Sequence, residues 1–143
     1  MENTHVRLLS RDGQVFEVGK TAVYMSRTIA KKLQLRLKSD HDSPVVLDGI
    51  AGDTLKKVIE YCNRHDVPYF SLADEAVVNS LSAFDAQFVN VDWTTFFALI
   101  DAADYLKIKP LMDLTCRTLS KKFKGKKYKE IMEVIENWKQ NAD

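Results

Sequence analysis

The segment Trp93–Leu106 limits the possible folds of this chain more than any other feature. If it is helical, apolar side chains cover more than half of its surface, and Asp92 stands before it as a natural N-cap. A helix that is apolar nearly all round lies at the centre of a domain or between two layers. The sequence therefore predicts a central helix here, with apolar positions Phe96, Phe97, Leu99, Ile100, Ala103 and Leu106.

A small β-sheet is predicted near the start of the chain. Val6–Leu9 and Val15–Val18 are rich in strand-forming residues, and Asp12-Gly13 stands between them. Asp-Gly between two such runs favours a β-hairpin, because glycine readily adopts the positive φ that the turn requires. Val45–Leu47 is expected to add a short third strand.

Helices are expected over most of the remaining sequence. Thr21–Leu33 has apolar residues at helical spacing, and a second helix is expected after Asp53, which we interpret as its N-cap. Ser39–Pro44 has the composition of a loop, and Tyr69–Asp85 shows no clear pattern, although Ala73–Leu81 is compatible with a helix. Further helices are predicted from Pro110 to Phe123 and, after a break at Gly125, from about Lys127 to Gln140. The expected class is α+β with a helical tail.

Composition disfavours some classes of partner. The 143 residues include 21 Lys and Arg and 20 Asp and Glu, giving a net charge of +1. So neutral a chain does not indicate nucleic acid or an anionic membrane as its main partner, and no apolar run is long enough for a membrane span. Cys62 and Cys116 both fall within apolar helical patterns, so we expect buried, reduced thiols in an intracellular protein, with a disulfide as the less favoured alternative.

No pattern of catalytic or ligand-binding residues is found. His5, His41 and His65 are scattered, so surface histidines are favoured over a metal site. The glycines form no phosphate-binding loop, and no serine lies in a nucleophile-elbow motif. Asp101 and Asp104 share a helix face, which favours a solvated or partner-binding surface over acid–base catalysis. The sequence predicts no catalytic residue, cofactor or metal, hence not an enzyme.

Two features leave alternatives open. The basic run Lys121–Lys127 is suited to nucleic acid or an acidic partner, but a lysine-rich helix end favoured by the helix dipole explains it more simply. The three C-terminal helices carry many large apolar residues. These residues form either a groove for a partner helix or a self-contained core.

Several segments, in order, match a known family. The chain resembles the S-phase kinase-associated protein (Skp) family, the adaptors of SCF cullin–F-box ubiquitin ligases, in which Ser10–Val18 corresponds to the opening S-x-D-G-x-x-F-x-V. The other matching segments are Leu55–Cys62, Phe88–Asp92, Phe97–Ile100, Ala102–Lys109, Leu111–Leu119 and Lys124–Lys126.

The resemblance implies a BTB/POZ-type domain over residues 1–108 and C-terminal helices that grip an F-box over residues 109–143. It also implies a non-catalytic adaptor of the cytoplasm and nucleus that links an F-box substrate receptor to a cullin in protein ubiquitination. By position, the cullin surface includes Asp104 and Tyr105. The F-box surface includes Phe97, Ile100, Leu111, Met112, Cys116 and Leu119.

The chain departs from the family pattern at several places. Asp104 stands where the family usually has asparagine, and Tyr69–Ala83 replaces an acidic insert. The helices that complete the family's F-box clamp are expected beyond the point where this sequence stops. These departures motivate an alternative, a Skp-like scaffold or homodimer through the C-terminal helices, serving a kinetochore or meiotic chromosome assembly.

Overall fold

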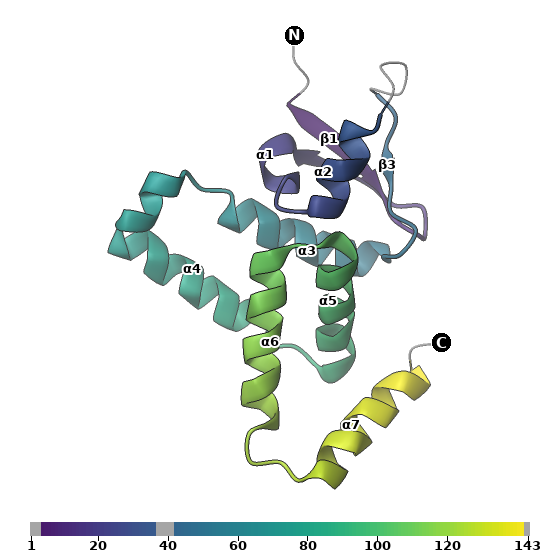
Figure 1. Cartoon of the computed structure of the whole chain (residues 1–143), viewed down its shortest axis with the longest axis vertical. Helices are drawn as coiled ribbons and strands as arrows, with labels where there is room; N and C mark the ends of the chain where they lie inside the picture. Colours follow the sequence, from purple (N-terminus) through teal and green to yellow (C-terminus); the bar gives the residue numbers. More distant parts are fainter. Residues whose placement is uncertain (1–3, 37–41, 142–143) are drawn as a thin grey trace.

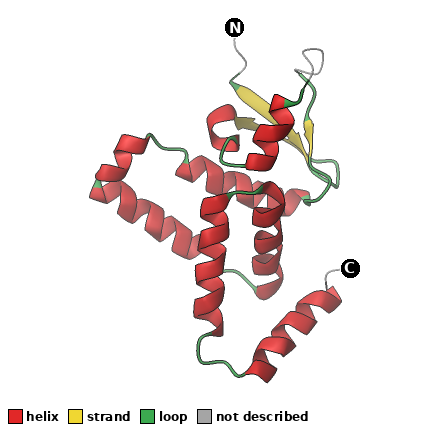
Figure 2. Ribbon diagram, viewed as in Figure 1, coloured by secondary structure: helices red, strands yellow, loops and turns green. Residues whose placement is uncertain are grey.

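The sheet lies at one end of the molecule, as Figures 1 and 2 show for this computed structural model, which describes residues 4–36 and 42–141. β1 (His5–Leu9) and β2 (Val15–Gly19) form the predicted antiparallel hairpin, and β3 (Val45–Val46) pairs parallel to β1, giving the order β2-β1-β3. Gly13 has φ 85° in the turn, as expected for Asp-Gly. Of the predicted loop Ser39–Pro44, residues 39–41 lie outside the described residues.

Asp12 links this turn to the next part of the fold. Its carboxylate accepts hydrogen bonds from Ser10 Oγ at 2.6 Å, Gln14 Nε2 at 2.9 Å and the backbone N–H of Gly52 at 2.8 Å. The hydrogen bond from Ser10, with those from Gln14 and Gly52, lowers the pKa of Asp12 to about 2. Because Gly52 begins α3 (Gly52–His65), the predicted N-cap Asp53 is wrong: Ala51 is the N-cap, and Asp12 satisfies an N–H of the first turn.

The helix predicted over Thr21–Leu33 is two helices. α1 (Lys20–Val23) is followed by its C-cap Tyr24, and α2 (Arg27–Gln34) begins after Ser26, whose Oγ accepts from the backbone N–H of Ile29 at 3.1 Å. The same hydroxyl donates to the carbonyl of Leu106 at 2.5 Å. This distant contact, which apolar spacing does not reveal, explains why the chain breaks at Ser26.

The segment after α3, for which the sequence shows no clear pattern, is mostly helical. A 3-10 helix, η2 (Tyr69–Ala73), is followed by α4 (Glu75–Phe88), which Asp74 caps through Ala76 N at 2.9 Å. The candidate helix Ala73–Leu81 is therefore correct in type but begins two residues early and ends seven short. In Figure 1, α4 extends to one side of the other helices.

α5 (Trp93–Leu106) has the predicted bounds and cap, since Asp92 Oδ1 accepts from Thr95 N at 3.1 Å. Its buried side chains include Phe96 and Leu99, each 0% exposed. α6 (Lys109–Phe123) begins with Pro110 in its first turn, and α7 (Tyr128–Asn141) follows the turn at Gly125, as expected. One buried core joins the sheet, α3 and α5 and continues into α6 at Leu111 and Leu114, so it crosses the predicted domain boundary at residue 108.

Candidate partner-binding surfaces

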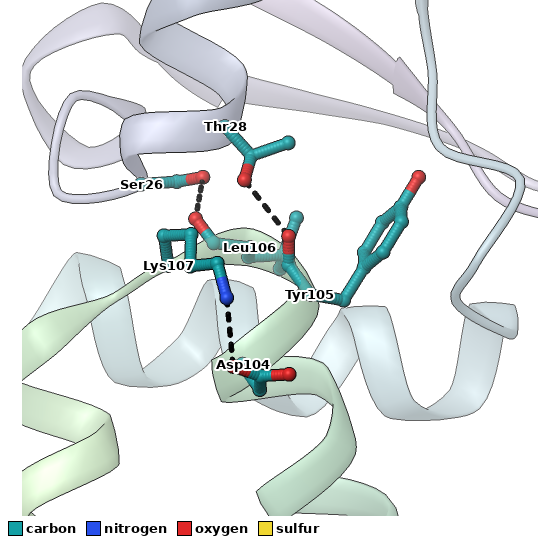
Figure 3. Close-up of polar contacts among 6 residues, drawn as sticks. All are labelled: Ser26, Thr28, Asp104, Tyr105, Leu106 and Lys107. Carbon is teal, nitrogen blue, oxygen red and sulfur yellow. Dashed lines mark hydrogen bonds and ion pairs between the residues drawn. The ribbon is translucent and has the colours of Figure 1, made fainter.

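The C-terminal end of α5 is held by hydrogen bonds to α2 (Figure 3). Ser26 Oγ donates to the carbonyl of Leu106, and Thr28 Oγ1 donates to the carbonyl of Tyr105 at 2.8 Å. The backbone N–H of Arg27 donates to the carbonyl of Lys107 at 3.2 Å. These bonds satisfy carbonyls that a helix end leaves without intrahelical partners. They therefore fix the backbone from which the predicted cullin residues project.

Asp104 and Tyr105 lie on this end with different surroundings. Asp104 is exposed and accepts from Lys107 Nζ at 2.7 Å, so its extra charge is both paired and solvated. Such an exposed pair contributes little to stability. The Tyr105 ring is half-buried and points away from Asp104 and Lys107 in Figure 3. Gly49 lies against it, since a Cβ at residue 49 would come within 2.4 Å of the ring.

The nearby Asp101 extends this surface. Partial burial, and then the charge of Asp104, raise the pKa of its carboxyl above the usual value. The acidic face that the sequence predicted for this part of α5 is present in the structure. The carboxylates of Asp101 and Asp104 lie on one exposed face of α5, beside Tyr105.

The N-terminal half of α5 is held instead by stacked rings. Phe123 of α6 stacks on Trp93 with centroids 5.2 Å apart, and Trp93 stacks on Phe97 at 5.6 Å. Trp138 of α7 contacts Phe97 at 4.9 Å. We call Phe123, Trp93, Phe97 and Trp138 the aromatic stack. It joins three helices, and through Trp138 it holds α7 against α5.

The six predicted F-box residues occupy different environments. Ile100, Met112 and Leu119 are half-buried and pack against the core from α5 and α6, as a receptive apolar surface requires. Phe97 is 9% exposed and lies beside Trp138. Leu111 is 0% exposed, so it supports this surface from the core.

Cys116 differs from its prediction. It is exposed, so the expectation that both thiols are buried is wrong for this residue. The helix turns its side chain into a separate cleft between α3, α4 and α6, lined also by Tyr61, His65, Asp85, Pro110, Asp113 and Arg117. Cys62 is buried as predicted, and burial raises the pKa of its thiol to about 12, which makes it a poor nucleophile.

The cleft contains a contact that the sequence did not indicate. His65 Nε2 lies 2.7 Å from Asp85 Oδ1, and the His65 ring stacks on Tyr61 at 4.3 Å. His65 is therefore not the surface histidine that we expected. Burial, and then the charge of Asp85, raise the pKa of Tyr61. His65 and Asp85 come from separate helices, α3 and α4, so no local spacing could have revealed that pair, whereas Tyr61 and His65 are four residues apart on α3. His41, another of the expected surface histidines, lies outside the described residues.

Sequence reasoning also missed the residues that fix both surfaces. Ser26 lies 80 positions from Leu106, and no pattern connects them. For the aromatic stack a signal was present, since Trp93 and Phe97 are four residues apart on one helix face.

Among residues 4–36 and 42–141, no group of three His, Cys, Asp or Glu side chains is arranged to hold a metal ion. Within the same ranges, no helix has the length and apolar character needed to cross a membrane.

Comparisons with known proteins identify relatives over most of the chain. The family described as "Skp1 family, tetramerisation domain" matches residues 4–67. SKP1-like protein 20 of Oryza sativa subsp. japonica is 38% identical over 141 residues, covering 88% of this chain and 79% of the relative. SCF ubiquitin ligase complex protein SKP1a of Dictyostelium discoideum is 38% identical over 134 residues, covering 91% and 82%. SKP1-like protein 1A of Arabidopsis thaliana is 40% identical over 136 residues, covering 92% and 83%.

Proposed function

The chain belongs to the Skp1 family, with a POZ-type α+β fold followed by C-terminal helices, and we propose that it is a non-catalytic adaptor joining an F-box substrate receptor to a cullin. One observation supports the proposal beyond family membership: the predicted cullin residues lie at the C-terminal end of α5 on a hydrogen-bonded backbone, whereas the predicted F-box residues come from the rest of α5 and from α6, beside the aromatic stack. An adaptor requires two separate surfaces on one rigid element. A relative's name, SCF ubiquitin ligase complex protein, supports the same role.

The cullin side is proposed to consist of Asp104 and Tyr105. A half-buried tyrosine ring on a fixed backbone is a typical hot spot of a protein interface. Replacing Tyr105 with lysine is expected to abolish cullin binding while the chain stays folded, with a modestly lower unfolding midpoint because the ring packs against the core. Replacing Tyr24, an exposed tyrosine on another part of the surface, with lysine is the matched control. Unchanged cullin affinity of Tyr105→Lys, measured by titration calorimetry, would remove Tyr105 from the cullin surface.

Gly49 offers a milder version of this test. A methyl group at residue 49 would overlap the Tyr105 ring and displace it without removing it. We expect Gly49→Ala to weaken cullin binding about tenfold, a typical loss for a displaced hot-spot residue. The affinity for an F-box domain should not change. Equal losses for both partners would indicate a general disturbance of the fold.

The F-box side is proposed to consist of Phe97, Ile100, Met112 and Leu119, with Leu111 beneath them. Cys116 is left out of this surface, because its side chain lies in the separate cleft between α3, α4 and α6. The first experiment is a calorimetric titration of the folded chain with a purified F-box domain. We expect sub-micromolar affinity, about −8 kcal/mol or better. Leu119→Glu should abolish this binding but leave cullin binding intact, because a carboxylate in an apolar contact loses its hydration.

One observation favours the second candidate, a scaffold with a reduced F-box clamp. Trp138 of α7 lies against Phe97, so part of the proposed F-box surface is already covered within the chain. This reading predicts a stable homodimer through the C-terminal helices that ignores F-box domains. A monomer that binds an F-box domain tightly would exclude it. The adaptor role supports a location in the cytoplasm and nucleus, which a fluorescent fusion of the full chain would test.

A further inference from the structure

Positive charge is concentrated in one short segment of this nearly neutral chain. Leu114–Lys129 contains seven of the 21 Lys and Arg residues and none of the 20 Asp and Glu residues. The other 127 residues therefore hold 14 basic and 20 acidic residues, a net charge of −6. Charge is therefore distributed very unevenly along the chain, although the overall net charge is only +1.

The lysines of this segment gather around the turn between α6 and α7, at the end of the molecule opposite the sheet in Figure 1. The chain reverses direction here with Gly125 at φ 79° and a hydrogen bond from Lys126 N to the carbonyl of Phe123 at 3.0 Å. We call Lys121, Lys122, Lys124, Lys126, Lys127 and Lys129 the basic turn. All except Lys122 are exposed. Within residues 4–36 and 42–141, no carboxylate forms an ion pair with any of them.

Helix stability explains only part of this cluster. Lys121 and Lys122 lie in the last turn of α6, where the helix dipole favours positive charge. Lys127 and Lys129, in contrast, lie at the start of α7, where the dipole disfavours it, and Glu130 is the acidic residue of that first turn. The lysines on the α7 side therefore reduce the stability of the helix that they begin. A role in binding accounts for them better than a role in folding.

The basic turn is continuous with the aromatic stack. Lys122 Nζ lies 5.2 Å from the centre of the Trp93 ring and 5.3 Å from that of Phe96. The next residue, Phe123, stacks on Trp93. A partner seated on the apolar surface of α5 and α6 would therefore have its flanking residues near these lysines.

We infer that the basic turn binds an acidic polypeptide segment that flanks the F-box of the partner, so that charge selects among F-box proteins. This inference rests on the proposed F-box binding. An acidic protein segment fits better than nucleic acid, because the neighbouring rings are engaged with one another instead of being open for base stacking. Exposed charges at the rim of an interface act mainly on the association rate and on partner choice.

The test uses the full chain and two probes: one F-box domain extended by a run of glutamates, and the same domain extended by an equal run of serines. We expect the glutamate probe to bind about tenfold tighter at low salt, as several exposed ion pairs together allow. The preference should arise in the association rate and should disappear in about 0.5 M salt. Lys124→Glu/Lys126→Glu/Lys127→Glu should abolish it.

The matched control reverses three exposed lysines elsewhere, Lys31→Glu/Lys32→Glu/Lys56→Glu, and should retain the preference. Equal affinity for the serine probe in all three proteins would show that each is folded. Equal binding of both probes by the unchanged chain would overturn the inference but leave the F-box proposal standing. Failure to bind either probe would overturn both. Tighter binding of a short duplex DNA than of the glutamate probe, lost in the basic-turn variant, would assign the lysines to nucleic acid.

Discussion

The two ends of α5 are fixed by different kinds of interaction. At its C-terminal end, hydroxyls of α2 bind two successive carbonyls, which sets the backbone in one geometry. At its N-terminal half, stacked rings of three helices hold one another without a directional bond. Hydrogen bonds weaken steeply when they are misaligned, whereas ring contacts tolerate sliding and tilting. We therefore expect one rigid surface and one adaptable surface on the same helix.

The largest effect that separates the two ends is expected for Ser26→Ala. This hydroxyl is buried, caps α2 and binds the carbonyl of Leu106. Loss of the cap and of a partner for a buried carbonyl together cost about 2–3 kcal/mol. Urea denaturation should show this loss in the free energy of unfolding. Ser82→Ala, at an exposed position of α4, should change it by less than about 0.5 kcal/mol. A similarly small loss for Ser26→Ala would mean that these hydrogen bonds do not rigidly fix the C-terminal end of α5.

Trp138→Ala tests the adaptable end and should have a smaller effect. The ring is half-buried and lies tilted against Phe97, so we expect a loss of about 1 kcal/mol. The change should be local: amide exchange should accelerate in α7 but not near Leu106. Trp138→Phe should retain most of the contact. Faster exchange at both ends of α5 would show that the aromatic stack and the hydrogen bonds from Ser26 and Thr28 form one cooperative unit.

The same contrast explains which features the sequence could predict. The hairpin and α5 follow from local patterns, namely Asp-Gly between strand formers and a capped apolar run, and both were predicted correctly. The break at Ser26, the Asp12 contact with α3 and the His65–Asp85 pair depend on residues 80, 40 and 20 positions apart. Local spacing contains no information about such contacts. The rigid end of α5 was therefore hidden from sequence reasoning.

For the candidate surfaces, the sequence predicted which helix faces are apolar, but it did not predict how exposed each side chain on them is. Apolar spacing indicated the helix faces of Ile100, Met112 and Leu119, and these side chains are half-buried in the structure. It did not distinguish Leu111, which is in the core, from Cys116, which is exposed, because both belong to the same broad apolar pattern on α6. The direction of a side chain at the edge of such a pattern depends on the neighbouring helices. Here those helices are α3 and α4.

The smallest effect is expected in the pH dependence of stability. It concerns Asp12, at the hairpin end of the molecule. Asp12 holds the hairpin turn and the start of α3, and its hydrogen bonds lower its pKa from 3.8 to about 2. A lowered folded-state pKa means that the contribution is complete above pH 3.8 and is lost as the pH falls through about 2. The aromatic stack has no titrating group, so its contribution should not change over this range.

Asp12→Asn should therefore lower stability modestly at neutral pH, and the difference from the unchanged chain should close as the pH approaches about 2. The asparagine amide can occupy the site but accepts the hydrogen bonds of Ser10, Gln14 and Gly52 less strongly than a carboxylate does. Thermal unfolding at several pH values measures the difference, with Asp53→Asn on the exposed first turn of α3 as the control. A constant difference between the Asp12 variant and the unchanged chain from pH 7 to pH 2 would show that the carboxylate charge does not hold this junction. Hydrogen bonds would then fix only the contact between α2 and α5, and not the junction between the hairpin and α3.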